Sequence, residues 1–323
     1  MGKATKSLLF SPCTIFAAPA SPQISMKSTT SPALPFILLA ILALIWGSSF
    51  ILMKRGLVVF TPMEVAALRV AISGVLLAPF AVRAWFSLEN KRLAWYFLLC
   101  GALGNAIPAM LFTTAQKHLN SSTGALLNSL TPLFTLLLGI IIFKLQLRRS
   151  QIIGVLIGFV GAVVLVFAAK GEIAPGETSW YALLPVLATV CYGMNANVIS
   201  HYLKGISPLT INSLALFGVT MFFLPYLILS GFFTEALPLA QAHPMFGVAL
   251  VSIITLSVLG TALSNALYTQ LIQISSPVFS SSVTYLIPVV AMAWGLLDGE
   301  HLSALHFIGI AIILAGIYLV NKR

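Results

Sequence analysis

The sequence predicts an all-α membrane protein of ten transmembrane helices, built as two inverted five-helix repeats. Three observations lead to this prediction: a composition too apolar for a water-soluble domain, ten apolar runs of membrane-spanning length, and paired motifs that recur at a nearly constant spacing. Of the 323 residues, 59% are hydrophobic and only 7% are charged, whereas soluble domains carry about 25% charged residues. With a mean hydropathy of +1.03, the chain has too little polar surface to face water on all sides.

Ten apolar runs are long enough to be transmembrane helices, because a spanning helix needs about 20 mostly apolar residues. The residues between the runs are Gly, Pro, Ser and charged residues, which are typical of loops. The predicted helices cover residues 34–53, 62–82, 93–115, 121–143, 150–169, 179–200, 208–230, 245–270, 277–297 and 304–321.

Basic residues predict the orientation of these helices, since Lys and Arg accumulate in cytoplasmic loops. With a cytoplasmic N-terminus, twelve Lys and Arg residues lie in the cytoplasmic tails and loops and four on the opposite side. Both termini are therefore expected in the cytoplasm. The net charge of +10 does not indicate nucleic-acid binding, because no basic patch is interleaved with aromatic residues.

Internal similarity predicts the repeat. Gly47 and Pro62 match Gly193 and Pro208 at a spacing of 146, and the segment "LGNAIPAMLFT" (103–113) matches "LGTALSNALYT" (259–269) at a spacing of 156. The expected divisions are a disordered extension (1–33), a first five-helix repeat (34–170) and a second one (171–323). Because five is odd, the two repeats cross the membrane in opposite senses, as in many transporters.

The chain resembles the drug/metabolite transporter superfamily, specifically its EamA-type ten-helix members. The resemblance rests on "WGSSF…K" (46–54), "TPMEVAALR" (61–69), "ALLNSLTPLFTLLLG" (125–139) and "YLIPVVAMAWGLLDGE" (285–300), and it covers about residues 34–321. Gly299-Glu300 keeps the family's Gly-Glu at the end of the ninth helix, whereas Lys144 stands at the equivalent place in the first repeat. The resemblance implies a transporter of a bacterial inner membrane, or of a plant membrane, and leaves the substrate open.

Polar residues within the apolar runs are the candidates for a substrate site. Trp46, Ser49 and Met53 form one stripe of the first helix at helical spacing, although Gly47 and the serines also suit close helix packing. Arg69 lies about 10 Å into the second helix, where it either meets an anionic group of the substrate or bonds to helix carbonyls. The other candidates are Asn105, Asn128, Tyr192, Asn195, Asn265, Tyr268 and Tyr285, for which bonding between helices is the alternative.

Two further groups are expected to have roles in transport or packing. Pro132 and Pro288 occupy equivalent positions in the repeats and suit hinges, because each removes a backbone donor inside a helix. Lys54 and Glu64 lie near the ends of the first two helices, where they are expected to form an interfacial ion pair, with coupling as the alternative. No Asp or Glu lies deep in any predicted helix, so a midplane carboxylate relay for protons is not expected.

These observations predict a membrane carrier, an exporter of small metabolites such as amino acids or related compounds, that works by alternating access. The alternatives are a channel-like pore and an intramembrane lipid-modifying enzyme. No enzyme signature is found, and no cofactor or metal site is expected. The expected partners are a small-molecule substrate and the lipid bilayer, in a monomer or homodimer; the expected place is the inner membrane of a cell, or a plastid membrane for a plant protein.

The first 33 residues are rich in Ser, Thr, Ala and Pro, contain no acidic residue and match no part of the family. A signal peptide does not suit this segment, because its apolar stretch is short and interrupted by Pro12. The remaining interpretations are a plastid transit peptide and a translation start at Met26. On both, residues 1–25 are expected to be disordered and dispensable.

Overall fold

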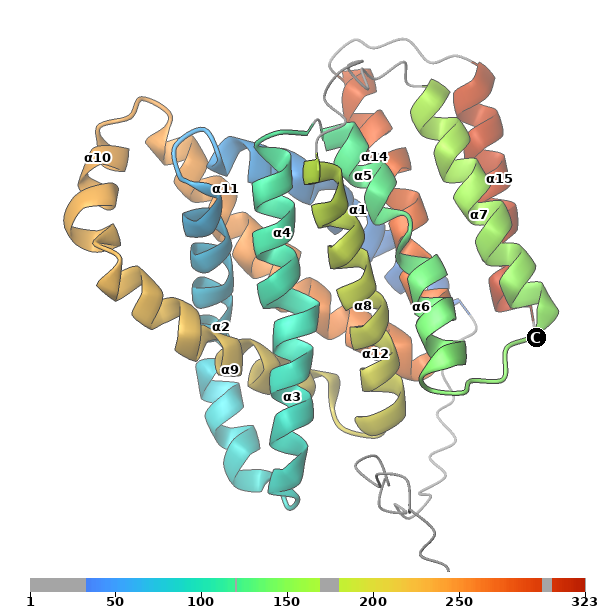
Figure 1. Cartoon of the computed structure of the whole chain (residues 1–323), viewed down its shortest axis with the longest axis horizontal. Helices are drawn as coiled ribbons and strands as arrows, with labels where there is room; N and C mark the ends of the chain where they lie inside the picture. Colours follow the sequence, from blue (N-terminus) through green and yellow to red (C-terminus); the bar gives the residue numbers. More distant parts are fainter. Residues whose placement is uncertain (1–32, 120, 169–179, 298–303, 323) are drawn as a thin grey trace, which may run out of the picture. The chain divides into compact units, whose positions relative to one another are not determined.

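The structure is a computed structural model of the chain, and it describes residues 33–119, 121–168, 180–297 and 304–322 (Figure 1). These residues form helices and turns and contain no β-strand, which confirms the all-α prediction. Residues 1–32 of the predicted extension and the Gly299-Glu300 motif lie outside the described residues.

The helices follow one another with short connections. The first half holds α1 (Leu34–Gly56), α2 (Pro62–Ser87), α3 (Ala94–Gly101), the π-helix η2 (Ala102–Ala106), α4 (Ile107–Gln116), α5 (Ser121–Asn128), α6 (Thr131–Ile141) and α7 (Arg149–Ala168). The second half holds α8 (Leu183–Tyr202), α9 (Pro208–Leu229), the π-helix η4 (Phe232–Ala236), α10 (Leu237–Gln241), α11 (Phe246–Ser257), the π-helix η5 (Val258–Leu263), α12 (Ser264–Ile274), α13 (Pro277–Ser281), α14 (Val283–Leu297) and α15 (Ala304–Asn321). The 3₁₀ turns η1 (Lys91–Leu93) and η3 (Trp180–Ala182) precede α3 and α8.

Six continuous helical segments among the described residues are long and apolar enough to cross a membrane. They lie over the first, second, third, sixth, seventh and eighth predicted runs. Four shorter apolar helices lie over the remaining runs, at Thr131–Ile141, Arg149–Val164, Pro277–Val290 and Phe307–Asn321. The fourth run is divided by a turn between α5 and α6, and the ninth by a turn between α13 and α14.

Local sequence explains where α2 begins. The backbone N–H of Thr61 donates to the Glu64 carboxylate (2.8 Å), and the N–H of Glu64 donates to the Thr61 hydroxyl (3.4 Å). This reciprocal capping box satisfies donors that a helix start leaves free, and Pro62 at the first helical position has no N–H to satisfy. The sequence "TPME" therefore starts a helix at the membrane boundary without help from other elements.

Two π-helical turns interrupt the third and eighth membrane segments at matching places. η2 begins at Ala102 and η5 at Val258, the spacing of 156 already seen between the segments "LGNAIPAMLFT" and "LGTALSNALYT". A π-turn widens the helix and shifts its hydrogen bonds from i+4 to i+5, so local carbonyls become available to side chains. Both turns contain a glycine, Gly104 and Gly260.

Glycine allows the backbones of α7 and α15 to approach closely, and the two helices lie side by side (Figure 1). A Cβ added at Gly316 would lie 2.5 Å from the backbone nitrogen of Gly158 and 2.7 Å from the carbonyl oxygen of Gly154. A Cβ at Gly161 would lie 2.7 Å from the backbone nitrogen of Ile313. Small residues at such a crossing maximise van der Waals contact where lipid provides no hydrophobic driving force.

Other helix pairs use the same kind of contact. A Cβ at Gly74 on α2 would overlap the side chain of Thr220 on α9, whose hydroxyl donates to the Val70 carbonyl (3.1 Å). A Cβ at Gly47 on α1 would lie 2.6 Å from Val290 on α14, and one at Gly193 on α8 would lie 2.8 Å from the backbone of Thr135 on α6. Each of these three contacts joins a helix of the first half of the chain to a helix of the second half.

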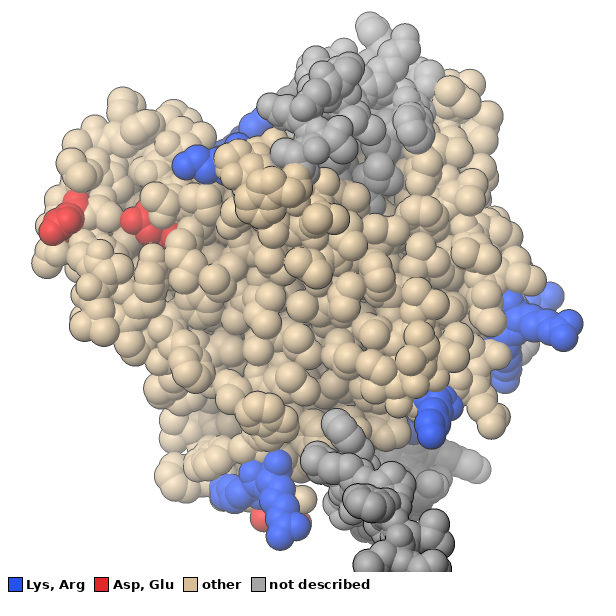
Figure 2. All heavy atoms as spheres, viewed as in Figure 1, with Lys and Arg blue, Asp and Glu red and all other residues tan. Residues whose placement is uncertain are grey.

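The face of the molecule drawn in Figure 2 is apolar over its middle. Figure 2 shows that, on this face, Lys, Arg, Asp and Glu lie at the periphery and leave a broad central area of other residues. Large apolar side chains are exposed along the helices, among them Leu44, Phe222 and Leu229. A surface of this kind suits contact with lipid, in which every charge costs free energy.

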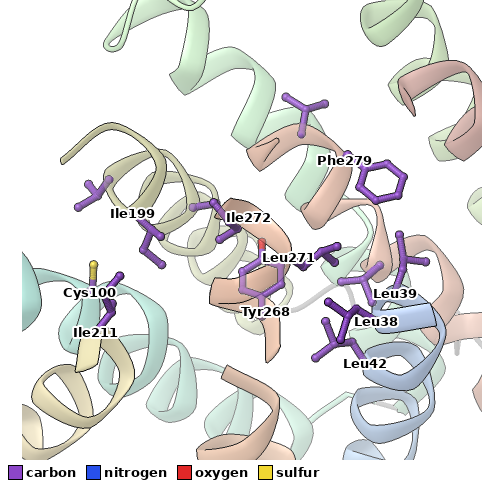
Figure 3. Packing of buried hydrophobic residues seen from close by; sticks show 14 of the residues in the cluster. Leu38, Leu39, Leu42, Cys100, Ile199, Ile211, Tyr268, Leu271, Ile272 and Phe279 are labelled. Atoms are coloured by element: carbon purple, nitrogen blue, oxygen red, sulfur yellow. The ribbon is translucent and has the colours of Figure 1, made fainter. Parts of the chain in front are cut away.

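The largest buried cluster joins both halves of the chain. Figure 3 shows Tyr268 of α12 inside it, with Leu38 and Leu42 of α1 on one side and Cys100 of α3 and Ile211 of α9 on the other. Tyr268 is 8% exposed and Leu42 is fully buried. The cluster packs α1 against α12.

We expect Gly316→Ala to destabilise the protein, because the added methyl group meets backbone atoms that cannot rotate away. Overpacking of a core costs about 1–3 kcal/mol, which should lower the melting temperature of the detergent-purified protein by several degrees. Gly247→Ala on α11 is the matched control, since a Cβ there has no heavy atom within 4 Å. Equal melting temperatures for the two variants would contradict the proposed importance of the α7–α15 contact.

Candidate functional site

A cavity lies between the two halves of the chain, and eight of the ten predicted binding residues line it. They are Trp46, Ser49, Arg69, Asn128, Tyr192, Asn195, Asn265 and Tyr268. Met53, the third member of the predicted stripe on the first helix, lines the cavity as well. The lining residues that were not predicted from the sequence are Phe50, Gly104, Phe112, Thr131, Thr284 and Ile287.

Two of the predicted binding residues lie elsewhere. The Asn105 side chain lines a small adjoining pocket and accepts a hydrogen bond from the Asn265 amide. Tyr285 is fully buried, and its hydroxyl donates to the Val155 carbonyl on α7 (2.7 Å). Tyr285 therefore packs α14 against α7 and does not line the cavity; the neighbouring residue Thr284 does, because adjacent helical positions differ by about 100°.

Trp46 connects α1 to the π-turn of the eighth segment. Its indole N–H donates to the Gly260 carbonyl (3.2 Å) and the Ser264 hydroxyl (3.0 Å). Its ring meets that of Tyr268 edge to face, with centroids 5.2 Å apart. The polar edge of Trp46 is thus fixed in the protein, and its aromatic surface forms part of the cavity wall.

Ser49 lines the cavity and also takes part in close helix packing, the two roles considered for it. Its hydroxyl donates to the Ile45 carbonyl one turn earlier (2.8 Å), which satisfies its donor within α1. A Cβ at Gly260 would lie 2.9 Å from this hydroxyl oxygen, so Ser49 also occupies the close contact between α1 and η5.

Arg69 is held by η5. Its Nε donates to the Thr261 hydroxyl (2.6 Å), and its Nη2 lies 3.5 Å from the Gly260 carbonyl oxygen. The Thr261 hydroxyl in turn donates to the Leu256 carbonyl (3.1 Å), five residues earlier. One turn later, the Ser73 hydroxyl contacts the carbonyls of Arg69 (2.6 Å) and Ser257 (2.8 Å), which joins α2 to α11.

Asn195 is the described cavity residue with a fully buried polar atom that has no hydrogen-bond partner. It is 8% exposed, and its Oδ1 is buried without a hydrogen-bond partner in the described part of the chain. A Cβ at Gly104 in η2 would lie 2.6 Å from its Nδ2. A buried amide oxygen without a donor costs free energy, which a ligand with an N–H or O–H group would recover.

The contacts of Ser49 and Asn195 are equivalent in the predicted repeat. Asn195 follows Ser49 by 146 residues, and Gly260 follows Gly104 by 156. Ser49 lies against Gly260, and Asn195 lies against Gly104. The sequence signal for Gly104 was its match to Gly260 at a spacing of 156, which marks a repeated position and does not by itself show that Gly104 lines the cavity.

The remaining candidates lie away from the cavity or at helix ends. Pro132 is the second residue of α6, directly after the turn that ends α5, and Pro288 lies inside α14. The predicted Lys54–Glu64 ion pair is not formed among the described residues; the Glu64 carboxylate caps α2 instead. Among the residues that the structure describes, no group of three or more His, Cys, Asp or Glu side chains could hold a metal ion.

Comparisons with known proteins agree with this architecture. The chain is 24% identical over 282 residues to the "Uncharacterized inner membrane transporter YedA" of Escherichia coli (strain K12), covering 87% of this chain and 88% of the relative. It is 27% identical to the "Probable terminal-alkyne amino-acid exporter" of Streptantibioticus cattleyicolor, covering 86% and 90% of the two chains. It is 24% identical to the "Probable amino-acid metabolite efflux pump" of Salmonella typhimurium, covering 86% and 92%.

A solved protein structure shares the fold, with a TM-score of 0.68 and 17% identity over 90% of this chain and 97% of the other. The sequence model of the EamA-like transporter family matches twice, at residues 34–167 and 179–322. These two matches together cover most of the chain, and they confirm the resemblance that the motifs indicated. The chain belongs to the EamA-like transporter family.

Proposed function

We propose that the protein is a carrier that exports small metabolites, such as amino acids or related compounds, across the inner membrane by alternating access. The observation that carries the proposal is the cavity, whose walls come from both halves of the chain: from α1, α2, η2, α4, α5 and α6 of the first and from α8, α12 and α14 of the second. A site between two inverted halves becomes accessible from one side and then the other as the halves rock.

The proposed halves are two inverted five-helix repeats, residues 34–170 and 171–323, with ten membrane helices in all. The double match of the family model supports this division. Equivalent contacts support it as well: Gly47 packs against Val290, and Gly193 packs against the backbone at Phe134 and Thr135. Pro132 and Pro288 remain candidates for hinges, since each lies within or beside an element that lines the cavity.

The proposed placement has both termini in the cytoplasm. The excess of Lys and Arg in the loops on that side supports this orientation. The name of a relative, an inner membrane transporter, supports the inner membrane as the location. The names of two relatives, an amino-acid exporter and an amino-acid metabolite efflux pump, support export of amino acids or related compounds.

The energy source that we propose is the gradient of the substrate itself or exchange for another solute. None of the described carboxylates, Glu64, Glu89 and Glu235, lines the cavity. A proton-coupled carrier usually places such a group on the substrate path.

Two alternatives to a carrier are an intramembrane enzyme and a pore, and the family argues against the enzyme. Counterflow in proteoliposomes separates a carrier from a pore, because only alternating access lets external substrate drive exchange of the internal pool.

We expect Arg69→Ala to abolish transport in proteoliposomes while the protein still inserts and purifies. Arg69→Lys should also be poor, at least tenfold below the wild type, because a lysine cannot make the paired contacts of a guanidinium. Thr261→Val and Thr261→Ser are matched controls: the first removes the hydroxyl that positions Arg69, and the second keeps it. We expect the valine variant to lose activity and the serine variant to keep it; normal transport by Arg69→Ala would exclude a substrate role.

Single cysteines at positions 46 and 192 should both react with a membrane-impermeant thiol reagent in a background without Cys13, Cys100 and Cys191. The reason is that Trp46 and Tyr192 line the same cavity from opposite halves. Substrate should slow both reactions. If neither position reacts from either side of the membrane, the substrate path lies elsewhere. A cysteine at Leu42, which is fully buried and does not line the cavity, should stay unreactive and serves as the control.

A further inference from the structure

The cavity carries one full charge and has no opposite charge to balance it. Among the described residues that line it, only Arg69 is ionised; the others are aromatic, aliphatic, amide or hydroxyl side chains. We propose that the substrates are small monoanionic carboxylates with an uncharged hydrogen-bond donor, namely 2-hydroxy acids and N-acylated amino acids, in preference to zwitterionic amino acids. This inference rests on the proposed function and narrows its substrates from amino acids and related compounds to the related acids that lack a free ammonium group.

The carboxylate is expected at Arg69. A guanidinium has five N–H donors and no acceptor, and the structure shows two of its nitrogens engaged, Nε with Thr261 and Nη2 with Gly260. These contacts hold the side chain against η5 and leave further N–H groups for a ligand. A carboxylate accepts such donors in pairs, with a strength and geometry that a neutral acceptor does not match.

A free ammonium group has no comparable partner in the cavity. Glu64 caps α2, Glu89 follows the end of α2, and Glu235 lies in η4, so none of the described carboxylates can meet it. In the same small space, the positive charge of Arg69 repels a second cation. The ring faces of Trp46 and the tyrosines attract an ammonium group less strongly than a carboxylate would. A zwitterion therefore loses hydration of its amino group without an ion pair in return.

Asn195 supplies the second half of the recognition. Its Oδ1 is buried and unpartnered, whereas the Asn265 amide is bonded to Asn105 and Asn128 Oδ1 lies 3.4 Å from the Thr131 hydroxyl. An acceptor of this kind favours a hydroxyl or amide N–H on the ligand. The donor must be uncharged, for the reason given above, which selects a 2-hydroxyl or an N-acyl group beside the carboxylate.

Aromatic rings form the rest of the wall and suit an apolar body. The Phe112 ring meets Phe50 edge to face and stacks with Tyr192, in both cases with centroids 6.1 Å apart. These rings line the cavity together with Met53 and Ile287. The preferred acids should therefore carry an aliphatic or aromatic side group.

The test compares three acids that differ at one position: L-phenylalanine, L-3-phenyllactate and 3-phenylpropanoate. Their dissociation constants are measured by calorimetry on the purified protein, and each is then tested in counterflow. We expect phenyllactate to bind at least tenfold more tightly than phenylalanine, and removal of the hydroxyl in phenylpropanoate to weaken binding several-fold. Phenylalanine binding as tightly as phenyllactate, or no binding of phenyllactate, would overturn the inference.

Two variants at one position separate the roles of charge and hydrogen bonding. Asn195→Asp places a carboxylate in the cavity with almost no change of shape, and it should reverse the preference toward phenylalanine. Asn195→Ala should abolish the distinction between phenyllactate and phenylpropanoate while keeping the preference over phenylalanine. If Asn195→Asp leaves the preference unchanged, the amino group is not excluded on grounds of charge and the inference fails.

The two measurements distinguish the inference from the proposed function. Binding of phenyllactate without counterflow would contradict the carrier mechanism and leave the substrate class standing. Counterflow of phenylalanine with no response to phenyllactate would leave the carrier standing and overturn the substrate class.

Discussion

The Gly260 carbonyl is the interaction on which the geometry of the cavity depends. It accepts hydrogen bonds from the Trp46 indole (3.2 Å) and the Ser264 hydroxyl (2.7 Å), and Nη2 of Arg69 lies at 3.5 Å. This carbonyl is available because η5 is π-helical and its hydrogen bonds are displaced. In a bilayer core no water can satisfy this carbonyl, so its contacts with Trp46 and Arg69 help to fix where α1 and α2 lie.

Glycine suits this position for a second reason. The Ser49 oxygen lies 2.9 Å from where a Cβ of residue 260 would stand, so a side chain there would displace the Ser49 hydroxyl. The same argument applies in the first half, where Gly104 in η2 meets the Asn195 amide. At both glycines, the missing side chain allows the close contact with Ser49 or Asn195, and these two residues line the cavity.

The two walls are similar in backbone and different in chemistry. Residue 215, which follows Arg69 by 146 positions, is Ala215, so only one side carries a cation. Trp46 bonds to its π-turn through the indole N–H, whereas Tyr192 stacks on Phe112. In the proposed carrier the two repeats rock around the site between them, and their unequal side chains give this site a direction: a cation on one side and an unpartnered amide oxygen on the other.

The sequence by itself determined the helical class, the places of the apolar runs and the start of α2, because apolar content, loop charges and the "TPME" capping box act over a few neighbouring residues. It also identified most of the residues that line the cavity, since helical spacing shows which side chains share one face of a helix. Helical spacing does not show what lies opposite that face. Tyr285 meets Val155, 130 residues away, and Asn105 meets Asn265, 160 residues away; Arg69 finds Thr261 only because η5 widens at that level. Only the tertiary structure decided these partners, because they depend on how helices distant in the chain are rotated and shifted against one another.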